Sequence, residues 1–202
     1  MSTILRRARN DALNPNEVEQ LLLGCRDLLD NLIVRLPVFT GMRIGEVQHM
    51  TRTWIVWEKG IIELSSRQLC SCYEGRTWRG GMWTPKTEAG IRNLLITGEI
   101  KSTLEDFFSS HEVVGRSRQA LEQRIGRIRQ RSGLSRRVYA HCLRATFATR
   151  LAEQGMSAPS LSYVMGWNGL EAAEHYVQSS MKRAHAEQQE IVNSVEERRR
   201  KL

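Results

Sequence analysis

The stretch HCLRATFAT, at residues 141–149, decides how the rest of the chain is interpreted. Leu143, Phe147 and Leu151 recur every four residues, and this spacing predicts an amphipathic helix with one buried face. Glycine commonly follows the last turn of a helix, so we expect this helix to end near Gly155. The stretch therefore reads as the opening of a helix that packs on the core.

Two residues of the first turn, His141 and Arg144, are three positions apart and so point in the same direction. The backbone N–H groups at a helix N-terminus also favour an anion. This turn thus combines a proton carrier, a permanent cation and a place for a phosphate. A surface histidine beside a solvated arginine would give the same pattern, because a His-x-x-Arg pair alone is a weak motif.

The composition is that of an ordinary globular chain, long enough for one sizeable core. No apolar run approaches the length of a membrane span, and the N-terminus lacks the apolar stretch of a signal peptide. We therefore expect a cytoplasmic protein with no membrane partner. The net charge of +8 favours a polyanionic partner.

The positive charge is concentrated between residues 116 and 137, where eight arginines accompany a single acid, Glu122. That segment carries a net +7, which leaves only +1 for the rest of the chain. Such a concentration predicts contact with a phosphate backbone. The arginines are Arg116, Arg118, Arg124, Arg127, Arg129, Arg131, Arg136 and Arg137.

The cysteines predict reduced thiols, since nothing in the sequence suggests secretion. Cys70 and Cys72 are too close for an easy disulfide, although a Cys-x-Cys pair could form half of a zinc site. No second Cys/His pair follows at the spacing of a zinc finger, so we expect no metal. Cys25 and Cys142 complete the set.

The first third of the chain predicts helices. Asn14 can cap a helix that starts at Pro15, and a second helix follows until Pro37 bends or ends it. Two glycines then flank Arg43 just before a short helix, which holds this arginine on a tight corner. Glu46 follows three residues later and can brace its guanidinium, although a surface ion pair would look the same.

The middle of the chain predicts strands at 54–58 and 61–64, followed by an irregular insertion over 66–81. A further strand pair, 82–85 and 91–96, would place Lys86 at the tip of a β-hairpin. A lysine on a turn is usually no more than a solvated side chain.

The last third again predicts helices, at 101–108, 117–131, 157–165 and 170–177 besides the one that opens at His141. Residues 1–13 read as a basic N-terminal arm or linker, and residues 181–202 as a charged helical tail. Together these elements predict an α+β fold, mainly helical, with a small antiparallel sheet.

Five of these segments, in this order, resemble the catalytic domain of tyrosine recombinases, the phage-integrase family. The family motifs correspond to Thr40–Glu46, Lys86 before a small-residue turn, the His-x-x-Arg stretch at 141–149, Met165–Trp167, and Tyr176. The resemblance covers residues 14–180 and implies that family's DNA breaking-rejoining fold. Each motif is weak alone, but five at familiar spacing are specific.

The sequence departs from the family pattern in several places. Trp167 stands where many members have histidine, and Ala145 replaces the usual histidine after the second arginine. An indole N–H can still donate to a phosphate oxygen. The sequences at 141–149 and 80–86 are most similar to those of integrases of archaeal viruses or plasmids. Members usually carry an N-terminal core-binding domain, which the residues before Asn14 cannot supply, so we expect a truncated chain or a minimal recombinase.

The resemblance implies DNA strand cleavage in which the Tyr176 hydroxyl attacks the scissile phosphate and forms a 3′-phosphotyrosine. A second 5′-hydroxyl then restores the backbone, so neither ATP nor another cofactor is required. His141 is the natural acid/base partner of the phenol, and Lys86 would protonate the leaving 5′-oxygen. The rival nucleophiles are Tyr163, Tyr139 and Tyr73, of which Tyr163 and Tyr139 read as packing residues.

The transition state would gather negative charge on the non-bridging oxygens. Arg43 and Arg144 can each donate two hydrogen bonds to these oxygens, with Trp167 as a further donor. Glu46 would orient Arg43. With these cations, no metal is expected at the site, and the sequence contains no acidic cluster to hold one.

The resemblance also implies partners. Four protomers would assemble on two specific sites in double-stranded DNA, at the nucleoid of the host cell. The C-terminal tail would dock on a neighbour, although a solvated helix that frays would give the same sequence pattern. Three other interpretations remain at this point: a type IB topoisomerase-like enzyme that relaxes supercoils, a DNA-binding regulator without catalysis, and a degenerate recombinase that binds but no longer cuts.

Overall fold

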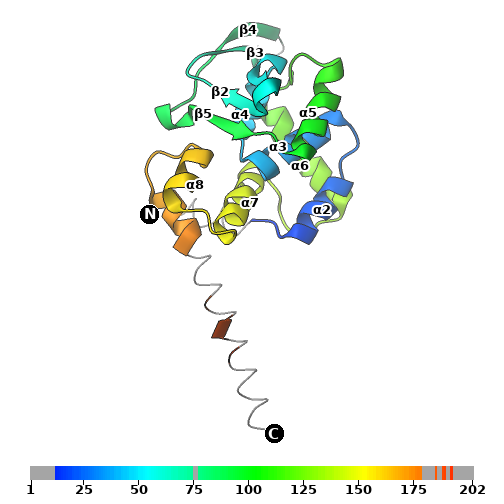
Figure 1. Ribbon diagram of the computed structural model, residues 1–202. Helices are drawn as coiled ribbons and strands as arrows, with labels where there is room; N and C mark the ends of the chain where they lie inside the picture. Colours follow the sequence, from blue (N-terminus) through cyan, green and yellow to red (C-terminus); the bar gives the residue numbers. More distant parts are fainter. Residues whose placement is uncertain (1–11, 75–76, 179–184, 186–187, 190–191, 193–202) are drawn as a thin grey trace.

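A computed structural model describes residues 12–74, 77–178, 185, 188–189 and 192 (Figure 1). Within these ranges the fold is mainly helical with two small antiparallel sheets, which confirms the predicted class. The basic arm up to residue 11 and most of the expected C-terminal tail lie outside the described residues. No helix in the ranges above is long and apolar enough to cross a bilayer.

The α-helices agree with the predicted positions and differ mainly in length. They are α2 (Pro15–Leu23), α3 (Leu28–Thr40), α4 (Ile44–His49), α5 (Gly98–Ser110), α6 (Arg118–Ser132), α7 (Ala140–Glu153) and α8 (Ala158–Met165). A further helical segment covers 171–178. Single 3₁₀ turns lie at Arg52–Trp54, Trp57–Lys59 and Glu88–Gly90.

The predicted start of α2 is confirmed. The Asn14 side chain accepts from the backbone N–H of Glu17, the Glu17 carboxylate accepts from the backbone N–H of Asn14, and Pro15 opens the first turn. The prediction that Pro37 ends the helix is wrong, because α3 continues through it to Thr40. A proline removes one hydrogen bond, and the buried residues around Pro37 offset that loss.

The central sheet has the order β1-β2-β5 and consists of β1 (Ile55–Val56), β2 (Ile61–Leu64) and β5 (Arg92–Leu95). Strand β2 matches its prediction. The predicted strand at 54–58 is reduced to two residues, because both flanking segments form 3₁₀ turns.

The prediction of an irregular insertion over 66–81 is wrong. Most of its described residues belong to a hairpin of β3 (Gln68–Glu74) and β4 (Thr77–Trp83). The predicted pairing of 82–85 with 91–96 is also wrong, since β4 pairs with β3 and β5 pairs with β2. The glycines near position 80 suggested a loop, but extended backbone accommodates them in β4. Lys86 therefore lies on the loop that joins the two sheets, rather than at a hairpin tip.

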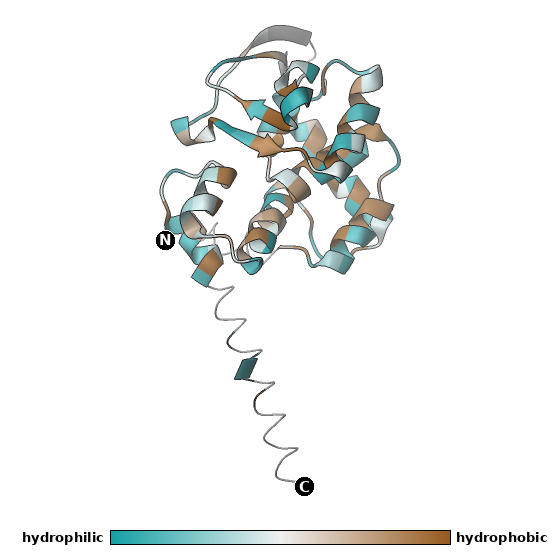
Figure 2. Cartoon of the chain, in the orientation of Figure 1, coloured by the Kyte–Doolittle hydropathy of each residue, from teal (hydrophilic) through white to brown (hydrophobic). Residues whose placement is uncertain are grey.

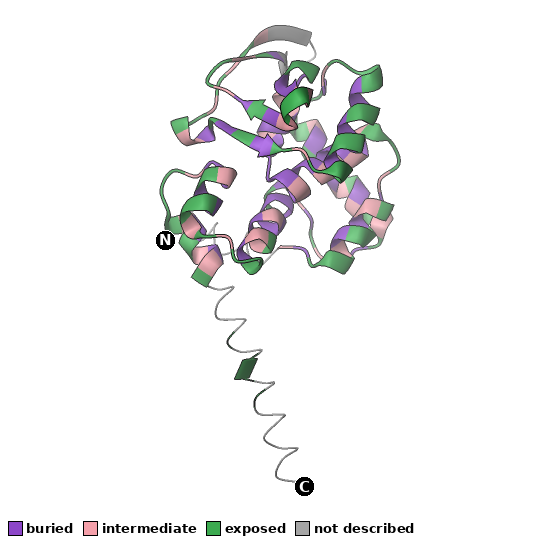
Figure 3. Cartoon of the chain, viewed as in Figure 1, coloured by how far each residue is buried: buried purple, intermediate pink, exposed green. Residues whose placement is uncertain are grey.

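Helix α3 is the centre of the molecule and packs against α5, α6 and α7 (Figure 1). The helices turn their hydrophobic sides inward, and the buried residues follow those sides (Figures 2 and 3). Leu13, which the sequence analysis placed in the arm, is 5% exposed, and its backbone N–H donates to Thr146 Oγ1 at 2.9 Å. The packed structure thus starts before α2.

A second hydrophobic cluster joins α7, α8 and the helical segment at 171–178. Its buried members include Ala148, Leu161, Met165 and Tyr176. On α7 itself, Leu143 is buried as predicted, whereas Phe147 is only half-buried and packs toward this second cluster. Helix α8 and the segment at 171–178 therefore pack together on α7.

Candidate active site

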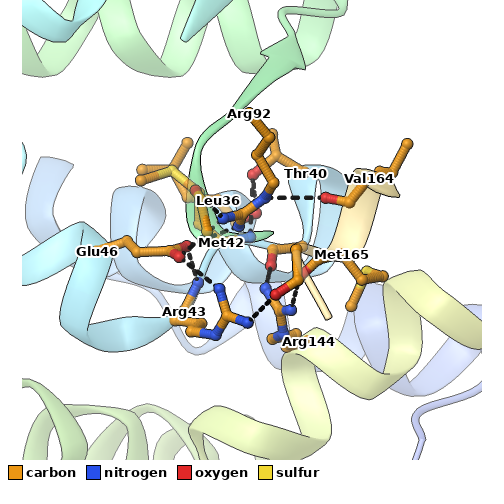
Figure 4. Close-up of polar contacts among 12 residues, drawn as sticks. Leu36, Thr40, Met42, Arg43, Glu46, Arg92, Arg144, Val164 and Met165 are labelled. Atoms are coloured by element: carbon orange, nitrogen blue, oxygen red, sulfur yellow. Dashed lines mark hydrogen bonds and ion pairs between the residues drawn. The ribbon is translucent and has the colours of Figure 1, made fainter. Parts of the chain in front are cut away.

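Glu46 connects two arginines of the site, Arg43 and Arg92. It is buried in α4 and accepts four hydrogen bonds: from the backbone N–H and the guanidinium of Arg43, and two from the guanidinium of Arg92 (Figure 4). The bonds to Arg92 measure 2.9 and 2.8 Å, and neither side chain is appreciably exposed. These guanidiniums lower the pKa of Glu46 to about 2 against the opposing effect of burial, with Arg92 contributing most.

Arg144 is buried at the start of α7, and its guanidinium donates to the backbone carbonyls of Gly41 and Met165 (Figure 4). One carbonyl follows α3 and the other ends α8, so this arginine joins both clusters. Burial, then the neighbouring Arg43, lowers the pKa of Arg144, but a guanidinium retains its proton in proteins. The result is a fixed positive charge on the floor of the site.

Arg43 lies between these two groups. Its guanidinium donates to Glu46 at 2.8 Å and to the carbonyl of Gly166 at 2.5 Å, while its side chain remains 37% exposed. A buried carboxylate and a carbonyl therefore orient a cation whose outer side reaches solvent.

Gly166 caps α8 with φ of +60°, and a Cβ there would lie 2.8 Å from the Ala89 carbonyl oxygen and 2.9 Å from the Arg92 guanidinium. At Gly41, which has a φ of +71°, an added Cβ would lie 2.7 Å from the Phe147 ring. The glycines let α7, α8 and the α3–α4 turn approach closely enough for the two arginines to reach the carbonyls.

A cleft of about 510 Å³ opens above this arrangement. Arg43, Lys86, His141 and Arg144, predicted as catalytic from four separate segments, all line it together with the supporting residue Glu46. Lys86 is exposed on its loop. The structure thus gathers four of the six predicted catalytic side chains around one opening.

His141 lies in the first turn of α7, at the edge of the cleft. Desolvation, then the positive charges of Arg118 and Arg144, lowers its pKa below the ordinary value of 6.5, and Glu122 acts weakly in the opposite direction. The imidazole is therefore neutral at pH 7 and able to accept a proton.

The other two predicted catalytic residues, Trp167 and Tyr176, stand beside the cleft. Their rings stack with centroids 5.4 Å apart and planes 17° apart, and Tyr176 is only 4% exposed. The Arg144 guanidinium lies 6.0 Å from the centroid of the Trp167 ring. Among the described residues, those that line the cleft include neither ring.

Two residues of this site, Arg92 and His49, were not predicted from the sequence. Arg118 was predicted to bind DNA but was not predicted to line the cleft. Arg92 also donates to the carbonyls of Val164 and Gly90, at 3.0 Å each. The only signal for Arg92 was a cation inside the predicted strand at 91–96. His49 lines the cleft beside Trp83, and burial lowers its pKa.

The rival tyrosines divide differently from the prediction. Tyr163 is 62% exposed on α8, so its prediction as a packing residue is wrong. The apolar side of α8 consists of Leu161 and Met165, and Tyr163 lies on the opposite side. Tyr139 is half-buried and precedes α7, in agreement with a packing role. The side chain of Tyr73 lies outside the described residues.

The eight arginines do not form one free patch. Arg124 pairs with Asp27 and Asp30, and Arg131 pairs with Asp30 at 2.5 Å. Arg136 pairs with Glu17 at 3.1 Å. These three arginines attach α6 and the following loop to α2 and α3. Their contact with DNA stays a prediction.

Of the remaining five arginines, Arg129 is half-buried and the other four are exposed. Arg129 and Arg137 line a second hollow of about 440 Å³, which shares His141 with the cleft. The Arg137 guanidinium lies 5.5 Å from the centroid of the Tyr139 ring. Arg116 and Arg127 are exposed.

The structure describes the side chains of Cys25, Cys70 and Cys142, none of which is in a disulfide. Burial, then Asp30, raises the pKa of Cys25 to about 11, which keeps this thiol protonated at neutral pH. Over the described ranges, no three His, Cys, Asp or Glu residues gather in a way that could hold a metal ion.

The sequence matches the phage integrase family over residues 11–183, and the chain belongs to that family. A curated tyrosine recombinase of Pseudothermotoga lettingae is 24% identical over 174 residues, or 86% of this chain and 58% of that protein. The chain thus spans little more than half of that relative.

Solved structures of tyrosine recombinases share the fold. The Tn1549 transposon integrase in complex with a circular intermediate DNA matches with a TM-score of 0.65 and 22% identity, over 86% of this chain and 65% of that one. XerA recombinase gives 0.65 and 16%, over 88% and 63%. The catalytic domain of bacteriophage HP1 integrase gives 0.56 and 18%, over 83% and 86%. The predicted family fold is confirmed.

Proposed function

We propose that this protein is a site-specific DNA recombinase that cuts and rejoins DNA through a 3′-phosphotyrosine intermediate. One observation carries the proposal: Arg43, Lys86, His141 and Arg144 come from four distant segments and line one cleft. Fixed guanidiniums beside a neutral imidazole suit a phosphoryl transfer that develops negative charge and moves a proton. Membership of the phage integrase family supports the same reaction.

In the first step the Tyr176 oxygen forms a bond to phosphorus, and the bond from phosphorus to the 5′-oxygen breaks. The phenol proton passes to the neutral imidazole of His141, and Lys86 supplies a proton to the departing 5′-oxygen. A 5′-hydroxyl from a second strand reverses the sequence and releases Tyr176. The phosphodiester bond is exchanged rather than hydrolysed.

Arg43 and Arg144 would stabilise the charge on the non-bridging oxygens. Both guanidiniums are oriented by backbone carbonyls and are in place before substrate arrives, so little reorganisation is needed at the moment of reaction. Trp167, next to Arg144, would contribute its indole N–H.

Tyr176 must leave its stack on Trp167 for this reaction, because the phenol is buried and lies outside the lining of the cleft. We therefore propose that DNA binding or a neighbouring protomer repositions the helical segment at 171–178. Assembly of four protomers on two DNA sites, at the cytoplasmic nucleoid, is part of this proposal.

The test uses a library of nicked duplexes with random sequence around the nick, so that a cleaved short fragment diffuses away and traps the covalent complex. Wild-type protein should form an adduct that survives detergent, and Tyr176→Phe should form none. Tyr163→Phe is the matched control and should react like wild type, since Tyr163 is exposed on the outer side of α8.

Other results would identify the alternatives. Tight DNA binding without an adduct in wild type would contradict the proposal and indicate a binding protein. An adduct with relaxation of a supercoiled plasmid, but without exchange between two recovered sites, would indicate a topoisomerase.

A further inference from the structure

Arg118 occupies a position that helix stability does not explain. It is the first residue of α6, where Ser117 caps the helix by accepting from the backbone N–H of Ala120 at 3.2 Å. A positive side chain in the first turn opposes the helix dipole. Its partner Glu122 lies four residues later, and a pair with the cation on the N-terminal side is the weaker orientation.

The Arg118–Glu122 pair lies at the boundary of two hollows. Arg118 lines the cleft, Glu122 lines the second hollow, and His141 lines both. The Arg118 guanidinium donates to Glu122 at 2.8 Å, and the two side chains are 52% and 44% exposed. Both groups are therefore accessible to a ligand that enters next to His141.

We propose that Arg118 is a positioning residue for the reaction, a third guanidinium of the cleft, which Glu122 holds beside His141 until a DNA phosphate replaces that carboxylate. The inference rests on the proposed function and adds to it an exchange of partners that accompanies substrate binding. An exposed ion pair is weak in water, so a phosphate can compete for the arginine.

The exchange would alter the proton affinity of His141. Of the charges that act on this imidazole, Arg118 has the largest influence and lowers its pKa, whereas Glu122 raises it. The phosphate that replaces Glu122 as the partner of Arg118 adds a negative charge near His141. The pKa of His141 should therefore rise toward its ordinary value, which suits a group that must accept and later return a proton.

Other groups also face the imidazole and must stay constant in a test. On the side of the cleft they are Arg43, Glu46, His49, Lys86 and Arg144. On the side of the second hollow they are Arg129, Arg137 and Tyr139. The test therefore changes only Arg118 and Glu122.

The first experiment is an NMR titration of the DNA-free protein, with the His141 signal identified by its absence in His141→Gln. Arg118→Gln should raise the pKa of His141 and Glu122→Gln should lower it, while Arg118→Lys and the exposed Arg127→Gln should leave it near the wild-type value. Shifts of the same direction in Arg118→Gln and Glu122→Gln would overturn the inference.

The second experiment measures binding of a random-sequence duplex as a function of salt. Arg118→Gln should reduce the salt slope by about 0.9, the value for one phosphate contact, and Glu122→Gln should leave the slope unchanged. Glu122→Gln should also tighten binding severalfold, and this gain should vanish in an Arg118→Gln background, because no partner remains to be released.

A gain that persists in the Arg118→Gln background would show simple repulsion by Glu122 and overturn the proposed exchange. An unchanged salt slope in Arg118→Gln would overturn the phosphate contact. Neither experiment requires strand cleavage. If wild type forms no adduct while these results hold, the proposed reaction fails and the partner exchange stands.

Discussion

At the scale of single residues, the site depends on one carboxylate among three guanidiniums. Glu46 satisfies two bonds of Arg92 inside the protein and also orients Arg43. Arg144 relies on carbonyls instead. Buried charges are tolerated only with such partners, so the chemistry of the cleft and the stability of the fold share the same residue.

Glu46→Gln should therefore destabilise the protein strongly. The substitution leaves the Arg92 guanidinium buried with a neutral partner, and loss of one member of a buried pair costs about 3–5 kcal/mol. Denaturant unfolding measures this change. Glu63→Gln, an exposed position on β2, should stay within about 0.5 kcal/mol of wild type. A similarly small change in Glu46→Gln would contradict the role given to this carboxylate.

Acid should remove the same contribution. The pKa of Glu46 is about 2 in the folded protein and near 4.5 when unfolded, so its stabilisation is complete above pH 4.5 and is lost as the pH falls toward 2. A shift of this size corresponds to at most about 3 kcal/mol. The difference in unfolding free energy between wild type and Glu46→Gln should shrink over that range. A constant difference would show that the carboxylate is not the titrating group.

The residue scale also shows what a sequence can and cannot predict. Arg43, His141 and Arg144 belong to local motifs whose spacing is visible in the sequence. Arg92 belongs to none, because its burial requires Glu46, 46 positions earlier in the chain. In β5 the alternation places Arg92 and Leu94 inside and Leu95 outside, and Ile91 just before the strand is also exposed. No hydrophobicity pattern would suggest this arrangement.

At the scale of elements, the end of α8 governs the geometry of the arginines, since Met165 and Gly166 supply the carbonyls that hold Arg144 and Arg43. Gly166→Ala should destabilise the protein and reduce adduct formation at least tenfold. The new Cβ would meet the Ala89 carbonyl oxygen at 2.8 Å, besides the strain of φ +60°.

Gly169→Ala is the matched control. Gly169 also has a positive φ, +89°, but its added Cβ would meet nothing within 4 Å. This variant should incur only the backbone strain, roughly 1–2 kcal/mol, and keep its activity once folded. Equal loss of adduct in both variants, compared as folded protein, would contradict the role of the α8 carbonyls.

Helix α6 and the loop that follows it divide their arginines between folding and binding. Arg137→Gln, beside the second hollow, should lower the salt slope of duplex binding by about 0.9. Arg124→Gln should leave the slope unchanged but lower the unfolding free energy, since Arg124 pairs with Asp27 and Asp30. The reverse pattern would show that the ion pairs open to bind DNA.

Element positions were predicted better than element pairings. Helix starts depend on local caps such as Asn14 and Ser117, which the sequence displays directly. The partners of β4 and β5 depend on contacts distant in sequence, and a strand pattern does not specify them. This is why Lys86 was predicted to lie on a hairpin tip and is instead on a loop between two sheets.

At the scale of the whole molecule, the order of five motifs along the chain predicted the family and the composition of the cleft. The placement of Tyr176 could not be predicted, because it depends on how the segment at 171–178 packs against Trp167 and α7. Arg43 and Arg144 already line the cleft in this structure, whereas Tyr176, the proposed nucleophile, is buried in the second hydrophobic cluster.

The proposed reaction requires that Tyr176 reaches this cleft and becomes joined to DNA. The most direct measurement is mass spectrometry of the trapped adduct after nuclease and protease digestion. We expect a nucleotide remnant linked through a 3′-phosphate to the peptide that contains Tyr176. A remnant on Tyr163, on Tyr139 or on any residue other than Tyr176 would contradict it.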